Sequence, residues 1–327
     1  MSRARSGRSL PRELIWSATG PDTELASALQ DLAAGRFIAA GDLLAAGGDI
    51  GSDLRCHRLM LMAPPAAVSR AAERWLAERP DECDAWALHA RVAVYRAVRA
   101  YREQQPASGA LAEVARRVCI GAAERFWWDP VPWVARLQLA CVPQFRGGSD
   151  AMDDPYRLIE DLSRRHPFSR EGYHRLLAAV GPDAGGSMIA MIDAARVAAS
   201  VAPAGSPLHL LPLLAHLKSF QRNAASSFND QVLFADREWS TAQARGEIDD
   251  AYQNWFAAPA RDPDEVLLPD LHLLAHALWK ASMFAEAAEV LTEIGPWAYP
   301  VPWSAHGDGA TFFKRARDRC LGQPRAG

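Results

Sequence analysis

One stretch of the chain, residues 129–203, contains a similar unit twice. The opening prolines, Pro130 and Pro167, lie 37 residues apart, and two Gly-Gly-Ser triplets, at 147–149 and 185–187, lie 38 residues apart. Each triplet leads into a run of helical character. Self-similarity at this period is typical of stacked helical hairpins, because one hairpin is too small to bury its own apolar face. The stretch therefore predicts an architecture but indicates no reaction.

Helical periodicity continues through the rest of the chain, and no run of alternating β-branched residues interrupts it. A helix that begins near Arg55 is expected to break at Pro64-Pro65, because proline removes a backbone donor. The acidic stretches 249–250 and 262–265 are expected to be solvated loops or helix starts. These patterns predict an all-α chain, with helical segments at 25–32, 40–44, 55–62, 71–80, 83–104, 111–125, 207–220, 271–294 and 311–321.

Several of these hairpins resemble tetratricopeptide repeats. Trp86 stands six residues after Pro80 and the small Ala90 four residues further on, as that family's pattern requires, and the hairpin at 271–294 fits it as well. The resemblance implies a right-handed superhelix, or α-solenoid, of degenerate tetratricopeptide-like hairpins. We accordingly expect a flexible basic tail, a repeat array, and an irregular cap with a short basic helix, at residues 1–12, 13–295 and 296–327 respectively.

The segment from 174 to 218 also resembles a group of uncharacterised actinobacterial proteins of tetratricopeptide-like character. The shared features are an arginine-proline turn at 165–167, a helix bearing His174, Gly-Gly-Ser at 185–187, Pro-x-Gly-Ser at 203–206 and an Ala-His pair at 215–216. This resemblance implies a superhelical scaffold and carries no established activity.

Composition and charge exclude several classes of protein. The net charge is -3, so no global field favours nucleic acid. Five scattered cysteines without a Cys-x-x-Cys pair predict neither a disulfide framework nor a structural zinc site, and fit a reducing cytoplasm. No apolar stretch is long enough to span a bilayer, and the arginines of residues 1–12 lack the apolar core of a signal peptide. We predict a cytoplasmic protein that binds neither membrane nor nucleic acid.

Two groups of residues are candidates for ligand contact. His272 and His276 lie one helical turn apart, with Trp279 on the same face and Lys280 beside it. Three interpretations are open for this face: half-buried packing, contact with a ligand or partner, and metal binding, although the glutamate of the usual zinc motif is missing. The tetratricopeptide resemblance implies that this face points into a concave groove, together with the second group: Asp84, Arg91, Tyr95 and His174.

Other motifs have structural explanations. The Gly-Gly-Ser triplets resemble anion-binding loops, but glycine permits a turn and serine caps the following helix, which we prefer. His209 and His216 are expected to be core residues rather than ligands. Trp127, Trp128 and Trp133 are expected to pack between adjacent hairpins, with an interface as the alternative. No dinucleotide fingerprint or nucleophile elbow occurs, so no cofactor, metal or catalytic residue is predicted.

The leading functional hypothesis is a non-catalytic scaffold that holds a peptide or protein partner in its concave groove. The alternative is an enzyme or a protein that binds a small ligand, for example a metabolite, inside the helical cavity. A closed pocket with converging His, Arg and acidic groups would favour the alternative over an open groove.

Overall fold

The computed structural model describes residues 13–47, 49–146, 153–225 and 237–322. Most of these residues are helical, and the two strands, β1 (Ile15–Trp16) and β2 (Trp297–Ala298), are two residues long each. The all-α class is therefore confirmed. The expected tail at 1–12 and the first Gly-Gly-Ser triplet lie outside the described residues.

The α-helices are, in chain order, α1 (Thr23–Ala33), α2 (Ile38–Ala46), α3 (Asp53–Ser69), α4 (Ala71–Glu78), α5 (Cys83–Arg102), α6 (Ser108–Arg125), α7 (Val131–Ala140), α8 (Pro155–Ser163), α9 (Arg170–Val180), α10 (Met188–Val201), α11 (Leu211–Ala224), α13 (Ala242–Ala251), α14 (Leu268–Lys280), α15 (Phe284–Ile294) and α16 (Gly309–Leu321). Shorter helical turns include η4 (Pro207–Leu210), η5 (Glu238–Ser240), η7 (Pro263–Glu265), η8 (Trp303–His306) and the π-helical turn Tyr252–Phe256.

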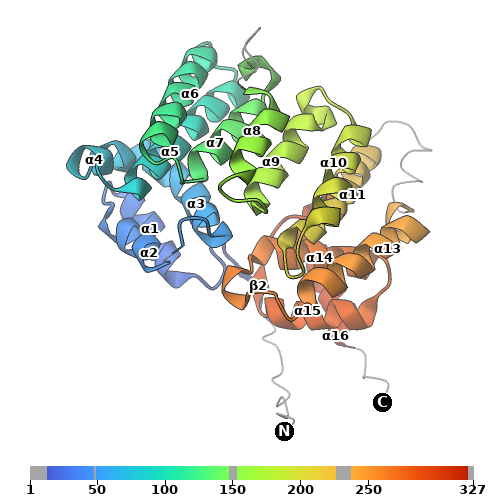
Figure 1. Cartoon of the computed structure of the whole chain (residues 1–327). Helices are drawn as coiled ribbons and strands as arrows, with labels where there is room; N and C mark the ends of the chain where they lie inside the picture. The colour runs from blue at the N-terminus through green and yellow to red at the C-terminus, as the bar shows by residue number, and fades with distance from the viewer. Residues whose placement is uncertain (1–12, 48, 147–152, 226–236, 323–327) are drawn as a thin grey trace.

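Alternate helices form a continuous row. The helices α1, α3, α5, α7 and α9 each contact the next member of the row, and α2, α6, α8 and α10 pack against them as the second helices of hairpins. The row continues through α11 to α14, on which α15 packs. Figure 1 shows that the helices follow an arc from α1 and α2 to α16. Buried apolar residues follow the same path as five successive clusters rather than one core.

The expected break at Pro64-Pro65 is wrong, because α3 continues through both prolines to Ser69. Proline in a helix interior costs about 3 kcal/mol through the lost donor and a steric clash. The buried side chains of α3, which include Leu59 and Met62, pack between α1 and α5 and offset that cost. The helix ends instead at Arg70, which has a left-handed backbone with φ of 61°.

The second Gly-Gly-Ser triplet is a helix start, as predicted. Gly185 has φ of +79°, which an L side chain rarely adopts, and the Ser187 hydroxyl accepts a hydrogen bond from the Ala190 amide at 3.0 Å. The triplet is therefore a turn and a cap for α10.

The C-terminal part of the arc contacts earlier parts of the chain at three places, which we call the closure contacts. Strand β1 pairs in parallel with β2, and the Ile15 amide donates to the Pro296 carbonyl at 2.9 Å. The Ser52 hydroxyl donates to Glu265 Oε1 at 2.6 Å, so of the two expected alternatives, a solvated loop or a helix start, the segment forms the short helical turn η7. Finally, Arg170 on α9 forms an ion pair with Asp270 on α14. The chain is thus closed on itself.

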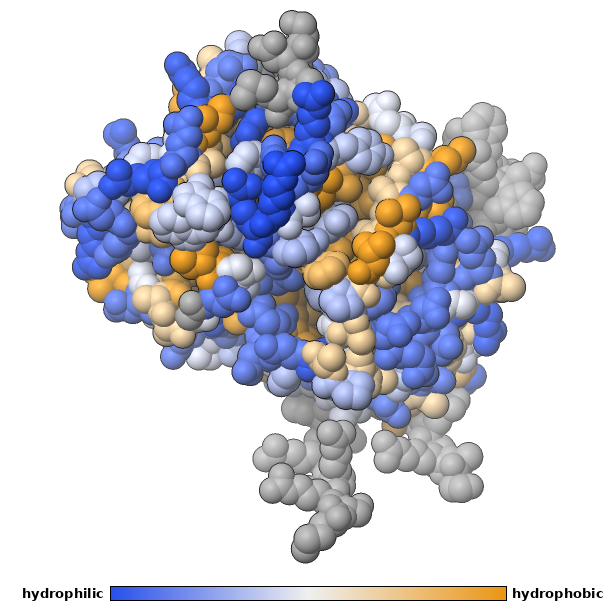
Figure 2. Space-filling model, in the orientation of Figure 1, coloured by the Kyte–Doolittle hydropathy of each residue, from blue (hydrophilic) through white to orange (hydrophobic). Residues whose placement is uncertain are grey.

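Two of the three clustered tryptophans lie on the surface, which corrects the expectation that they pack between hairpins. Trp127 is 64% exposed and Trp128 is 44% exposed, and their rings meet edge to face at 5.9 Å. Only Trp133 is partly buried, beneath the Arg165 guanidinium. A second group of exposed apolar residues, Ile189, Val197 and Val201, lies on α10, where Figure 2 shows hydrophobic side chains on a largely hydrophilic face.

No helix within the described parts of the chain is both long enough and apolar enough to cross a membrane.

Candidate functional site

A cavity of about 290 Å³ lies beside the closure contact between Arg170 and Asp270, which both line it. Its walls come from α3, α9, α11, α14 and the segment after β2. We call it the central pocket. Its polar lining consists of His57, Arg170, Glu171, His174, Arg175, Asp270 and Tyr299. Its apolar lining consists of Met60, Leu214, Leu217, Pro269, Leu273, Val301 and Pro302.

Local sequence fixes α9, which supplies four of the polar residues. The buried Ser169 hydroxyl caps the helix by accepting from the Gly172 amide at 3.3 Å. At Gly172 a Cβ atom would lie 2.3 Å from Leu162 Cδ2, so a larger residue would require the buried Leu162 side chain to move where α8 and α9 approach each other. The first turn of α9 is thereby held against its neighbour and directed at the pocket.

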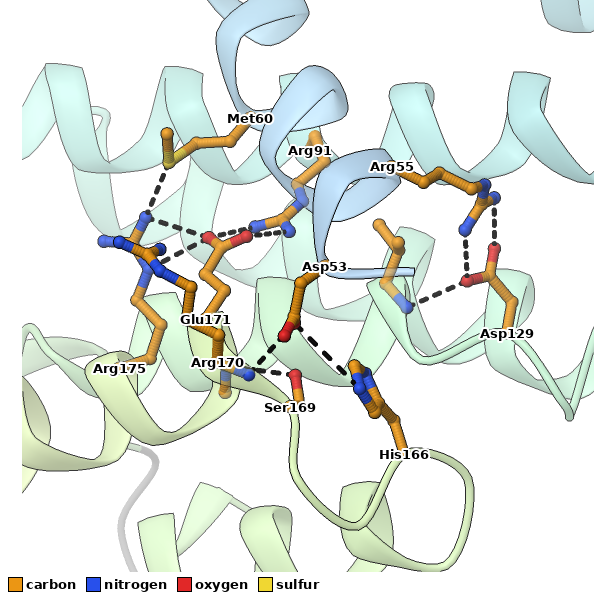
Figure 3. Close-up of polar contacts among 12 residues, drawn as sticks. Asp53, Arg55, Met60, Arg91, Asp129, His166, Ser169, Arg170, Glu171 and Arg175 are labelled. Atoms are coloured by element: carbon orange, nitrogen blue, oxygen red, sulfur yellow. Dashed lines mark hydrogen bonds and ion pairs between the residues drawn. The ribbon is translucent and has the colours of Figure 1, made fainter. Parts of the chain in front are cut away.

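Glu171 is the centre of a buried charge network (Figure 3). Its two carboxylate oxygens accept from Arg91 Nη1 and Nη2 at 2.8 and 2.6 Å, and Oε1 also accepts from Arg175 at 3.0 and 3.2 Å. Burial alone would raise the pKa of Glu171, but Arg91 and Arg175 outweigh it and lower the pKa to about 2. Glu171 is therefore ionised at neutral pH, and Arg91 holds it from behind the pocket wall.

Arg170 carries the second pair of the wall. Its Nε and Nη2 donate to the two oxygens of Asp270, both at 2.6 Å, and its backbone amide donates to Asp53 Oδ1 at 3.0 Å. Figure 3 shows Asp53 between Arg170 and His166. Burial raises the pKa of Asp53 to about 7, although Arg170 opposes the shift. Asp53 is thus only partly ionised at neutral pH, behind the first turn of α9.

Two neutral imidazoles face the pocket. Burial lowers the pKa of His57 to about 4, and Arg170 adds to the shift. Burial also lowers the pKa of His174 well below its usual value, assisted by Arg170 and Arg175. Within the described parts of the chain neither ring makes a hydrogen bond. Each ring therefore offers one donor and one acceptor to a molecule in the pocket.

Comparison with protein-family models, with curated proteins and with solved structures finds no match for this chain. Interpretation of the site therefore depends on its geometry.

The predicted site residues are distributed over four places. His174 is the one that lines the central pocket, and Arg91 supports it from behind. Asp84 belongs to a neighbouring ion cluster, in which it accepts from Arg55 at 2.9 Å while Arg55 also pairs with the buried Asp129. Tyr95 is partly buried against the apolar cluster of the first hairpins. Of these four residues, His174 is the one that lines the central pocket in the described structure.

The other four predicted residues lie together, beneath the C-terminal segment. His272 and His276 are fully buried; His272 Nδ1 accepts from Trp303 Nε1 at 2.9 Å, and His276 shares a 2.7 Å hydrogen bond with His306. Trp279 packs against Trp303, and the Lys280 ammonium lies 5.4 Å from the centre of the Phe220 ring. Of the three interpretations of this face, packing agrees with these contacts.

No group of three or more His, Cys, Asp or Glu side chains in the described chain is placed to hold a metal ion. His216 is buried between Glu238 and Glu247, at 2.7 and 2.6 Å. Burial would lower its pKa, but the two carboxylates raise it to about 9. His216 is therefore a charged cross-link between α11 and α13.

Sequence reasoning missed most of the pocket. His57, Arg170, Glu171, Arg175, Asp270 and Tyr299 carry no motif and come from distant parts of the chain. The only local signal was the Ser169 cap, which fixes where α9 begins and hence which residues form its first turn.

The buried histidines predict acid sensitivity. The pKa of His57, at about 4, lies below the usual unfolded value of about 6.5, so the unfolded chain binds more protons between these values. His57 alone should therefore lower the free energy of unfolding by about 2–3 kcal/mol as the pH decreases from 6.5 to 4, whereas Asp53, whose pKa burial raises to about 7, contributes in the opposite direction over the same range. Urea unfolding at several pH values measures this. His216 does not oppose the loss, because its contribution is complete below pH 6.5 and disappears as the pH rises towards 9.

Replacing His57 with glutamine should remove its contribution, so that stability falls less between pH 6.5 and 4 than it does in the wild type. Replacing His209, a partly buried residue bonded to the Pro203 carbonyl, is the matched control. Equal slopes for the two variants would contradict the assignment.

Proposed function

We propose that the protein binds a small molecule in the central pocket. The observation that carries this proposal is the convergence of two neutral imidazoles, a guanidinium and a phenol on a cavity with an apolar opposite wall. Small-molecule sites have this composition: mostly apolar, with a few polar groups that fix orientation. Their volumes are about 300–1,000 Å³, and this pocket lies at the lower limit.

The closure contacts also support a small ligand over a peptide. A peptide held by a repeat array needs an open concave surface that extends over several hairpins. Here α3 and α9 contact each other directly, and β1 joins β2 across the ends of the arc. Of the residues first assigned to a groove, Arg91, His272 and His276 are buried.

We further propose that the hairpins between residues 13 and 295 form a right-handed superhelix of degenerate tetratricopeptide-like repeats. The succession of contacts from α1 to α9 supports this, as does the small, fully buried Ala90 on α5. An experimental structure in which successive hairpins share no common right-handed rotation would contradict it.

A variant that blocks the pocket tests the binding proposal. Val301 lies on the pocket wall and is 46% exposed, so tryptophan at this position should obstruct the pocket without disrupting a core. Val68 on α3 is 74% exposed and does not line the pocket, so Val68→Trp is the matched control. We expect compounds of a metabolite library to stabilise the wild type and Val68→Trp by about 2.7 kcal/mol at 100 times their Kd, but not Val301→Trp.

Thermal unfolding with each compound, checked by calorimetric titration, measures this effect. If no compound stabilises the wild type, or if Val301→Trp responds equally, the pocket is not the binding site and the proposal is overturned.

A further inference from the structure

Both carboxylates of the pocket wall are already occupied. Glu171 accepts from Arg91 and Arg175, and both oxygens of Asp270 accept from Arg170. A cationic ligand would have to compete with a buried arginine for a carboxylate whose charge that arginine already balances. The wall is therefore unsuited to a cation.

Most of the pocket's unused hydrogen-bonding groups are donors. Arg175 uses Nε and Nη2 on Glu171, and its Nη1 makes no hydrogen bond within the described chain; the side chain is 25% exposed. The Tyr299 hydroxyl is likewise unbonded within that part, and His57 and His174 each offer one N–H group. These groups come from α3, α9 and the segment after β2, and they suit a ligand group that accepts several hydrogen bonds.

The charges around the pocket indicate which charge the ligand group should carry. The guanidinium groups of Arg91, Arg170 and Arg175 face two carboxylates, which leaves one positive charge next to the pocket. Asp53 does not cancel this charge in full, because burial raises its pKa to about 7. One negative charge on the ligand would balance the excess, whereas a dianion would exceed it.

The remaining lining determines the body of the ligand. Leu214 and Leu217 on α11, Leu273 on α14, and Val301 present apolar surface to the same cavity. A purely polar anion would leave this surface in contact with water, at a cost of about 25 cal/mol per Å². A ligand with an apolar body would cover it.

We propose that the ligand is a small organic acid with one carboxylate, bound by Arg175, and an apolar body against Leu217 and Leu273. This inference rests on the proposed function of the central pocket. The carboxylate accepts from the free Nη1 of Arg175 and from the neutral His57, His174 and Tyr299 groups around it. The acid binds without disturbing the Arg91–Glu171 pair.

Matched probes test the carboxylate. Benzoate and hexanoate are titrated calorimetrically into the full chain beside their neutral amides, benzamide and hexanamide, and beside phenyl phosphate. The acids should bind about 10- to 100-fold more tightly than the amides, because a hydrogen bond to a charged group is the interaction that the amides lose. They should also bind more tightly than the phosphate dianion.

Variants of Arg175 locate the interaction. Arg175→Gln should remove the preference for acid over amide, and Arg175→Lys should retain part of it. The fold should tolerate both changes, because Arg91 keeps both oxygens of Glu171. Tyr299→Phe, which removes no charge, should weaken benzoate less than Arg175→Gln does, and it provides a second test if an arginine variant is unstable.

Three results would overturn the inference: equal binding of acids and amides, stronger binding of phenyl phosphate, or no binding of any probe. The library experiment with Val301→Trp remains independent of these results. A library compound of another class that binds only to the unblocked pocket would keep the proposed function while refuting the organic acid.

Discussion

Replacing Glu171 with glutamine should destabilise the fold by about 3–5 kcal/mol. The change removes the only carboxylate in the described parts of the chain that pairs with Arg91, a residue that is 2% exposed, and leaves the Arg91 charge buried without compensation. Removal of one partner from a buried ion pair typically costs this much. Urea unfolding at pH 7 measures the difference in the free energy of unfolding.

Two variants separate the stranded charge from other effects of this replacement. Glu160→Gln removes a carboxylate that is 67% exposed and pairs with Arg164, and it should cost at most about 1 kcal/mol. Adding Arg91→Met to Glu171→Gln removes the stranded charge, so most of the lost stability should return. If Glu171→Gln lowers the stability no more than Glu160→Gln, or if adding Arg91→Met lowers it further, the stranded Arg91 charge is not the cause of the loss.

The second large effect is expected at the closure contacts. Asp270 is 2% exposed and holds Arg170 through two hydrogen bonds of 2.6 Å between α9 and α14. Asp270→Asn should lower the free energy of unfolding by about 3 kcal/mol, the lower end of the range for a broken buried ion pair. The cost is at the lower end because Asp53 can ionise further and balance part of the Arg170 charge. Urea unfolding measures the cost, and hydrogen exchange at the Ile15 amide, which bonds to Pro296, reports whether the ends separate.

Asp264 is the matched control for this experiment. It lies in η7 close to the same contacts but is exposed, so Asp264→Asn should change neither the stability nor the exchange of Ile15. Slow exchange at Ile15 in Asp270→Asn would mean that β1 and β2 stay paired without the ion pair.

Helical periodicity was enough to predict the class of the fold. The long helix α5 and the hairpin of α14 and α15 lie where their apolar patterns placed them, because amphipathic spacing is local information. Pro64 and Pro65 misled the prediction of α3, since burial between α1 and α5 outweighs the local preference of proline.

The central pocket could not be predicted in the same way. Arg170 and Asp270 are 100 residues apart, and Arg91 and Glu171 are 80 apart, so only the path of the whole chain brings them together. The pattern of His272 and His276 was visible because it is local. It does not reveal that Trp303 and Phe313, from further along the chain, cover both rings.

Closure of the arc has a consequence for the order of folding. Hairpins such as that of α14 and α15 need only short loops and form from neighbouring residues, whereas the pairing of Ile15 with Trp297 spans nearly the whole chain. Contacts of such high contact order carry a larger entropic cost and form slowly. The pocket combines residues from His57 to Pro302, so it is complete only when the C-terminal part of the chain has been synthesised and docked. A nascent or truncated chain would contain folded hairpins and no central pocket.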